Sequence, residues 1–172
     1  MSTTPPFVPV IDTREQRPLL FPVPSVRRTL DAGDYAILGI HNKGDNILLA
    51  ERKDPGDMVN TFLYRREQFD RVLGELAKCR WKLIVIEATG GQIVRGKYHS
   101  KAHPNSVIGL LAGAFADHGV PWALCESPYY TARFLYSFMG AAIRRMKDND
   151  EHDLLARIAR KPTEEPEGGI EA

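Results

Sequence analysis

The sequence GDYAILGIHNKGDNILLAERK, residues 33–53, consists of two apolar runs separated by a polar segment. The runs, 35–40 and 46–53, are typical of β-strands. Between them, His41–Asp45 contains the Asn and Gly residues that suit a tight reversal of the chain. We therefore expect a β-hairpin in which the two ends of the quoted stretch lie side by side.

Glu51 and Lys53 stand two residues apart at the end of the second strand, so their side chains point to the same face. A partly desolvated carboxylate and ammonium at this position cost stability unless a ligand compensates for them. A divalent metal ion and a phosphate would do so. Glu51 would then bind Mg²⁺ or Mn²⁺, and Lys53 would stabilise the attacking hydroxide and the charge developing on phosphate. The alternative is a plain surface ion pair at a strand end.

Three aspartates are placed to join this pair. The hairpin puts Asp34 roughly opposite the segment from Glu51 to Lys53, and Asp57 lies just beyond the strand, from where it can reach back to the metal or its waters. Asp12 ends another short apolar run and is a fourth candidate carboxylate. An aspartate, a gap of sixteen residues and then Glu-x-Lys is a layout common in metal-dependent nucleases with a restriction-endonuclease-like core.

A longer pattern surrounds these residues. The sequence reads Gly33-Asp34, a gap, and then Glu51-Arg52-Lys53-Asp54-Pro55-Gly56-Asp57. An earlier motif, apolar-Asp-x-Arg-Glu, stands as Ile11-Asp12-Thr13-Arg14-Glu15. In these motifs, and over roughly residues 8–135, the sequence resembles the nuclease domain of the XPF family, structure-specific endonucleases that cut branched DNA.

The resemblance implies an α/β fold with a restriction-endonuclease-like core, a central mixed β-sheet flanked by α-helices. It also implies hydrolysis of a phosphodiester bond in DNA, with Asp34 and Glu51 as ligands of Mg²⁺ or Mn²⁺ and Lys53 as the catalytic cation. The resemblance further implies that Arg52 and Asp57 belong to the active site. It implies that Asp12, Arg14 and Glu15 lie beside this site.

The sequence departs from the family pattern in two places. The family has an Arg followed four residues later by Gln in the next helix, whereas here Arg65 and Arg66 precede Gln68 by three and two residues, so either arginine is a candidate DNA contact. Eukaryotic and archaeal members also carry tandem helix-hairpin-helix motifs, and this sequence ends too early for them. We therefore expect the nuclease domain itself, as a homodimer or with a partner protein, to hold the DNA.

Strands and helices alternate along the rest of the sequence, which indicates a mixed α/β sheet with helices on both faces. We expect a nuclease domain over residues 1–150, followed over 151–172 by an acidic helix and a disordered tail. The expected strands are 7–11, 82–87 and 120–125, and the expected helices are 59–80, 107–118 after Pro104, and 127–146. We expect a loop or a ragged extended stretch over 19–28, because Pro18 precedes it and Pro22 and Pro24 lie within it, and a loop over 89–103.

The loop 89–103 is a candidate DNA-binding segment. Arg95, Lys97 and Lys101 place three cations around an aromatic residue, a mixture that can contact phosphates and stack on an unpaired base. The same composition also occurs in ordinary solvated loops, so both interpretations stay open.

Composition sets further limits. The chain has 172 residues and a net charge of +1, but eight acidic residues against three basic ones from Asp148 onward leave a body of +6 and a tail of −5. A mildly basic body is compatible with DNA binding. Cys79 and Cys125 belong to no CxxC pair, and no signal peptide or membrane span is visible, so we expect an intracellular protein, cytoplasmic, nucleoid-associated or nuclear.

The sequence supports one leading hypothesis and two alternatives. The leading one is a metal-dependent DNA endonuclease acting at branched or single-strand/duplex junctions in repair or recombination. The first alternative is a non-catalytic DNA-binding or dimerisation subunit, although inactive partners in this family typically lose the acidic and lysine residues that are present here. The second is a nuclease that acts on RNA or on plain duplex ends.

Overall fold

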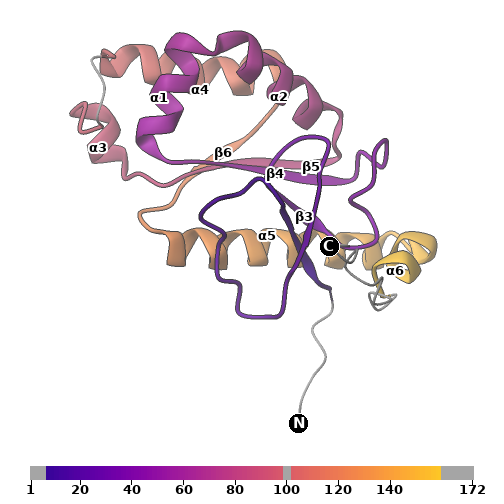
Figure 1. The fold of residues 1–172 in the computed structure, drawn as a ribbon. Coiled ribbons are helices and arrows are strands. Elements are labelled where there is room, and N and C mark those ends of the chain that lie inside the picture. The colour runs from indigo at the N-terminus through magenta and orange to yellow at the C-terminus, as the bar shows by residue number, and fades with distance from the viewer. Residues whose placement is uncertain (1–6, 99–101, 160–172) are drawn as a thin grey trace, which may run out of the picture.

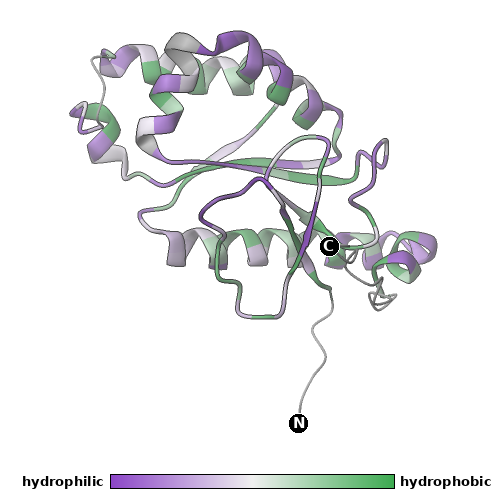
Figure 2. Ribbon diagram, viewed as in Figure 1, coloured by the Kyte–Doolittle hydropathy of each residue, from purple (hydrophilic) through white to green (hydrophobic). Residues whose placement is uncertain are grey.

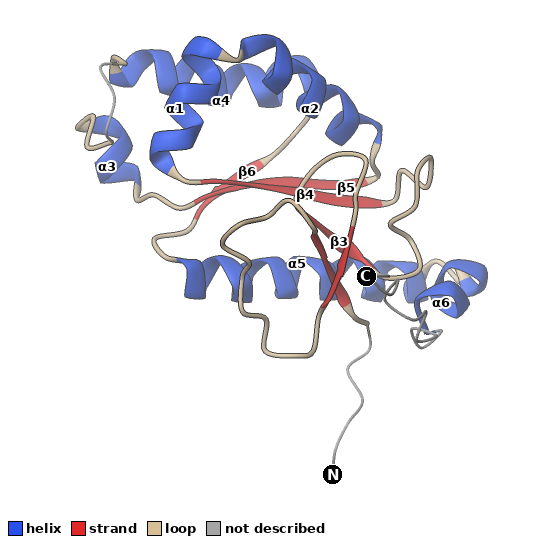
Figure 3. Cartoon of the chain, in the orientation of Figure 1, coloured by secondary structure: helices blue, strands red, loops and turns tan. Residues whose placement is uncertain are grey.

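The computed structural model describes residues 7–98 and 102–159, which form a six-stranded mixed sheet covered by helices on both faces (Figures 1 and 3). The strand order is β2-β1-β3-β4-β5-β6, with β1 and β3 antiparallel, β3 and β4 antiparallel, and the other neighbours parallel. The expected fold class is confirmed. The strands are β1 (Pro9–Asp12), β2 (Val26–Arg28), β3 (Tyr35–Ile37), β4 (Leu48–Lys53), β5 (Trp81–Ile86) and β6 (Trp122–Leu124).

Two layers of helices enclose this sheet (Figure 3). On one face, α5 packs against a core that includes Tyr35, Ala50 and Val85. On the other, α1 to α4 cover Ile84, Ile86 and the adjoining part of the sheet. The helices are α1 (Pro55–Tyr64), α2 (Arg66–Lys78), α3 (Gly90–Val94), α4 (Pro104–His118), α5 (Pro128–Asp148) and α6 (His152–Ala159).

The hairpin that the sequence predicts is formed by β3 and β4. Tyr35 pairs with Ala50, and the amide of Asp34 donates a hydrogen bond of 2.9 Å to the Ala50 carbonyl. Continuing this register by one residue puts Asp34 opposite Glu51, as expected. The reversal is longer than expected, because β3 already ends at Ile37 and β4 begins only at Leu48.

The prediction of a single helix over 59–80 is wrong in two respects, because the helical segment begins earlier and is divided into two helices. The Asp54 carboxylate accepts hydrogen bonds from the amides of Gly56 and Asp57, so α1 begins at Pro55. The helix then breaks at Arg65, where φ −134° and ψ 39° are not helical, before α2 begins. Neither Gly nor Pro marks this break, and the apolar spacing continues across it.

Two segments without a predicted helix or strand contain regular structure. The segment 19–28, expected as a loop or a ragged extended stretch, ends in β2, which extends the sheet as a parallel neighbour of β1 through the pairing of Val26 with Val10. The loop 89–103 contains α3, whose start is fixed by reciprocal hydrogen bonds between Thr89 and Gln92, a capping box. That T-x-x-Q signal is present in the sequence and could have indicated the helix.

The predicted strands 7–11, 82–87 and 120–125 and the predicted helices 107–118 and 127–146 are confirmed, with small shifts at their ends. Helix α6 lies in the segment where an acidic helix was expected, whereas the tail expected beyond residue 159 lies outside the described residues. Helix α4 begins at Pro104 and ends before Gly119, whose φ of 60° is left-handed, and α5 begins after the N-cap Ser127. Cys79 and Cys125 are free and buried. Within the described residues, no helix is both long and apolar enough to cross a membrane.

Candidate active site

The alternation of side chains along β4 separates two groups at the end of this strand. Leu48 and Ala50 belong to the α5 core, whereas Leu49 packs toward the other face, beneath α2. Continuing the alternation sends Glu51 and Lys53 to the face under α1 and α2, and Arg52 to the α5 face. In Figure 2 the mostly hydrophobic β4 becomes hydrophilic where it approaches α1.

Glu51 and Lys53 form a tight ion pair as the strand ends. Only 4% of Glu51 is exposed, and its Oε1 lies 2.5 Å from the Nζ of Lys53, whose side chain is 18% exposed. Burial lowers the pKa of Lys53, but the nearby carboxylates of Glu51, Asp34 and Asp57 raise it by more. The ammonium is therefore charged at neutral pH and held in one place.

Asp34 faces Glu51 across the hairpin. Burial, followed by the negative charge of Glu51, raises the pKa of Asp34 to about 7, although the Arg52 amide donates a hydrogen bond of 2.7 Å to its Oδ2. Two carboxylates that face each other in a site largely shielded from solvent repel each other when both are ionised. A bound cation would remove this repulsion.

This donor set fits a hard divalent metal ion. Carboxylate oxygens are the ligands that Mg²⁺ and Mn²⁺ prefer, and Mg²⁺ is usually held by one or two carboxylates, with water and substrate phosphates completing its shell. Among the described residues there is no group of three or more His, Cys, Asp or Glu side chains that could hold a metal by themselves. Asp34 and Glu51 therefore suit an open metal site rather than a closed protein cage.

Asp57 contributes from the first turn of α1 rather than from the end of the strand. Burial and the neighbouring Asp54 raise the pKa of Asp57, while Lys53 and Arg17 lower it. Asp57 lines a hollow together with Glu51 and Lys53, so it lies close to this pair. The N-cap that starts α1 early thus also positions this aspartate.

Arg52 belongs to a separate network on the other face. Its guanidinium donates to both oxygens of Glu87, at 3.0 and 2.9 Å, and to the Arg17 carbonyl, and it lies 3.6 Å from Glu15 Oε2. Tyr35 also donates to Glu15, at 3.2 Å. Glu87 is a residue that the sequence reasoning missed. The sequence does contain an indication of Glu87, because this residue directly follows the apolar run that forms β5, the buried parallel neighbour of β4.

Asp12 is fully occupied by hydrogen bonds. It is 1% exposed, and its two oxygens accept from the Arg14 amide and guanidinium and from the Leu30 amide, at 2.7 to 3.0 Å. Burial alone would raise the pKa of Asp12, but these hydrogen bonds outweigh it and lower the pKa. Asp12 and Arg14 therefore fix the loop beside the carboxylates, while Glu15 joins the Arg52 network.

We expect Asp12→Asn to destabilise the protein by about 2 kcal/mol at pH 7, because charge-assisted hydrogen bonds to a buried carboxylate are lost. A lowered pKa means that this stability is present above the unfolded-state pKa of about 3.9 and disappears as the pH falls through the folded-state pKa. Urea unfolding at pH 7 and pH 3 measures both effects. An equal difference between variant and wild type at the two pH values would contradict the assignment.

A hollow of about 450 Å³ opens beside the carboxylates, between β4 and helices α1 and α2. Arg65 lines it, because the break between α1 and α2 places this residue there, whereas Arg66 lies on α2 with its Nε 3.8 Å from Asp70. The described cations Arg95 and Lys97 are exposed and do not line the hollow, and Lys101 lies outside the described residues. The residues lining the hollow are Glu51, Lys53, Asp57, Asn60, Thr61, Arg65, Gln68, Phe69 and Val72.

Comparisons with known proteins show which family and which solved structures this chain is similar to. The family model of the ERCC4 domain matches residues 11–138. The solved structure of XPF from Aeropyrum pernix is similar at 21% identity and a TM-score of 0.58, over 78% of this chain and 60% of that one. The structure of XPF from Aeropyrum pernix in complex with DNA is similar at 19% identity and a TM-score of 0.61, over 81% of this chain and 66% of that one. No curated protein sequence gives a significant match.

These similarities establish the fold, a restriction-endonuclease-like core as in the XPF nuclease domain, which confirms the expected resemblance. The chain spans about two thirds or less of the solved chains that it matches.

Proposed function

The chain belongs to the ERCC4 domain family, and from this we propose that it is a metal-dependent endonuclease that hydrolyses phosphodiester bonds in DNA. The observation that carries the proposal is that the partly buried Asp34 lies opposite the buried Glu51, with the Lys53 ammonium fixed 2.5 Å from Glu51. Such a combination costs stability in an empty protein and becomes favourable when a cation and a phosphate are bound.

Asp34 and Glu51 would hold Mg²⁺ or Mn²⁺, which when bound activates water and offsets negative charge on the phosphate. Lys53 needs no reorganisation to act, since Glu51 already fixes its position. Its charge stabilises the phosphate oxygen on which negative charge grows during attack. Asp57 helps to keep this ammonium protonated.

The remaining site residues bind and position. Arg65 and Gln68, which line the hollow, would contact the DNA strand, with Arg65 favoured over Arg66 by its position. Arg52 acts on the opposite face by fixing β4 against Glu87, and its backbone amide orients Asp34. Asp12, Arg14 and Glu15 support the neighbouring loop, and Arg95, Lys97 and Lys101 are outer DNA contacts.

The role in the cell is part of the same proposal. A nuclease that cuts at branched or single-strand/duplex junctions would act in repair or recombination, wherever its DNA is kept, in the cytoplasm or nucleoid or in a nucleus.

A second copy of the chain is the partner that we propose. β6 is the last strand of the sheet, and exposed apolar side chains surround it, among them Phe115 at 62%, Trp122 at 38% and Phe134 at 45% exposure. An open edge strand with exposed aromatic residues favours association. Sedimentation equilibrium should give twice the monomer mass of 19.3 kDa, and a monomer at all concentrations would exclude it.

The proposed activity is tested with labelled flap, fork, duplex and single-stranded DNA, each with Mn²⁺, Mg²⁺ or EDTA. We expect cleavage with metal only, and an at least 100-fold slower rate for Glu51→Gln, which keeps the shape of the side chain and loses its charge. RNA substrates and blunt duplexes distinguish the alternative nucleases. A folded wild type that binds these substrates but cleaves none would instead favour a non-catalytic subunit.

A further inference from the structure

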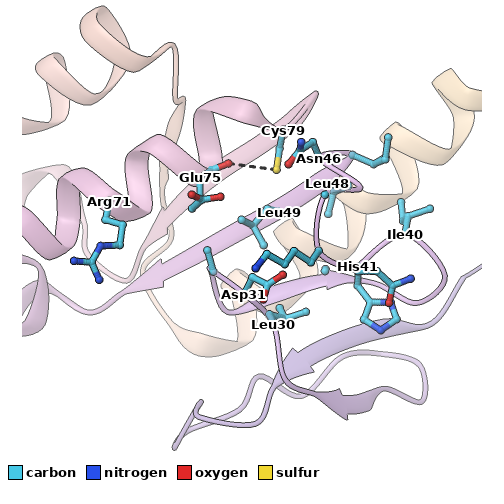
Figure 4. A pocket seen from close by; sticks show the side chains of 16 residues that line it. Leu30, Asp31, Ile40, His41, Asn46, Leu48, Leu49, Arg71, Glu75 and Cys79 are labelled. Atoms are coloured by element: carbon cyan, nitrogen blue, oxygen red, sulfur yellow. Dashed lines mark hydrogen bonds between the residues drawn. The ribbon is translucent and has the colours of Figure 1, made fainter.

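A second hollow, of about 310 Å³, lies between β4, α2 and the segments around residues 31 and 42 (Figure 4). The hollow described above, lined by Glu51 and Lys53, is called the catalytic hollow. Leu49 of β4 forms part of the floor of the second hollow, and Arg71 and Glu75 of α2 form one wall. The segment 30–32 forms the opposite wall, and His41 lies at the end away from the end of β4 (Figure 4).

The two hollows are parts of one groove. Along α2, Gln68 and Val72 line the catalytic hollow, whereas Arg71 and Glu75 line the second, and residues three or four apart on a helix share one side. Along β4, Glu51 lines the catalytic hollow and Leu49 the second one. These two residues are about 7 Å apart along a strand, a distance that one nucleotide of an extended chain covers.

The lining of the second hollow combines free charge with an apolar floor. In the part of the chain that the structure describes, neither Arg71 nor Lys43 has an ion-pair partner, whereas Glu75 is paired with Lys78 at 2.7 Å. Leu49 and Ala32, which are both partly buried, supply apolar surface. Acceptors are present as well, from Asp31 and Asn46.

These features suit a nucleotide better than a bare phosphate. An unpaired cation at the rim can bind a backbone phosphate, apolar side chains can contact the face of a base, and carboxylate or amide oxygens can accept from N–H groups on its edge. A volume near 300 Å³ is at the lower end of the range for sites that take small organic ligands. It leaves no room for a stacked base pair.

We propose that the second hollow binds one unpaired nucleotide next to the scissile phosphodiester, with Arg71 on its phosphate. The proposal rests on the proposed nuclease function and adds to it that the substrate strand must be single-stranded, or have its base flipped out, at this position. Junction DNA meets this requirement, and an intact duplex meets it only after a base pair is opened.

Binding without catalysis tests the phosphate contact. The probe is a fluorescein-labelled oligodeoxythymidine of about 12 nucleotides, measured by fluorescence anisotropy in EDTA at several salt concentrations. We expect Arg71→Ala to weaken binding about 5- to 10-fold and to reduce the slope of log K against log salt by about one. The matched control is Arg145→Ala, an arginine of 74% side-chain exposure on α5, across the sheet, which should leave affinity and slope unchanged.

A second variant tests whether the base enters. Ala32→Trp would fill the hollow from the segment 30–32 without removing a charge. We expect it to weaken binding of the oligodeoxythymidine while leaving binding of a blunt duplex unchanged. Circular dichroism of each variant confirms that it is folded.

The outcomes separate the two proposals. The second hollow is not a nucleotide site if Arg71→Ala binds the oligodeoxythymidine as tightly as wild type does, or if Arg145→Ala weakens this binding by the same factor as Arg71→Ala. In either case the nuclease proposal stands as long as the wild type cleaves DNA. Unchanged oligodeoxythymidine binding by Ala32→Trp also overturns the nucleotide site. If binding depends on Arg71 but no substrate is cut, the nucleotide site stands and catalysis fails. Absence of any binding by wild type overturns the nucleotide site.

Discussion

Replacing Lys53 with methionine is expected to slow DNA cleavage by about 10²- to 10³-fold, with a much smaller change in DNA affinity. The ammonium is held 2.5 Å from Glu51 and is mostly shielded from solvent, so its charge is in place before the reaction begins. Methionine keeps the apolar length of the side chain and removes only the charge. Single-turnover cleavage with saturating enzyme measures the chemical step separately from binding.

The control for this prediction is Lys147→Met, which removes an exposed lysine from the last turn of α5, across the sheet. We expect wild-type rates from it. Because loss of Lys53 leaves Glu51 and Asp34 without their cation, the affinity for Mn²⁺ should not fall in Lys53→Met. A variant that cleaves within a few-fold of the wild-type rate would show that Lys53 is a structural partner of Glu51 and no more.

Replacing Arg52 with methionine is expected to destabilise the protein by about 3–5 kcal/mol, the usual effect of breaking a buried ion pair by removing one partner. The side chains of Arg52 and Glu87 are each 10% exposed and that of Glu15 is 14% exposed, so two carboxylates would be left without compensation. Urea unfolding monitored by circular dichroism gives the free energy of unfolding of the variant and the wild type.

A double-mutant cycle makes this prediction specific. Glu87→Gln removes the charge that Arg52→Met leaves behind, so the double variant should be clearly more stable than the sum of the two single effects predicts. Simple additivity, or a loss below about 1 kcal/mol for Arg52→Met alone, would mean that Arg52 is not what fixes β4 to β5 at this edge.

The parts of the site that the sequence predicts well are those governed by local geometry. Side-chain alternation brings Glu51 and Lys53 together, and the hairpin brings Asp34 opposite them, because both effects act within about twenty residues. The N-cap Asp54, which moves Asp57 into a helix, was also readable in the motif Asp-Pro-Gly-Asp, but apolar periodicity alone gave a later start.

The parts that the sequence does not predict depend on contacts between distant segments. Arg52 stands in the same motif as Glu51, yet its partner is Glu87, and only the parallel pairing of β4 with β5 brings them together. The sequence makes Asp12 a candidate metal ligand, but in the structure its oxygens accept hydrogen bonds from Arg14 and from the Leu30 amide. The position of Arg65 depends on a helix break that no Gly or Pro announces.

The alternation of Glu51, Arg52 and Lys53 would make the fidelity of folding a condition of the proposed activity. If β4 paired with its neighbours one residue out of step, the guanidinium would point toward the proposed metal site and the acid and lysine would point into the α5 core. Such a chain could retain its helices and much of its compactness while lacking the carboxylate that we propose as a metal ligand. The Arg52–Glu87 bond therefore serves as a register lock, since it can form only when every side chain of β4 is on its proper face.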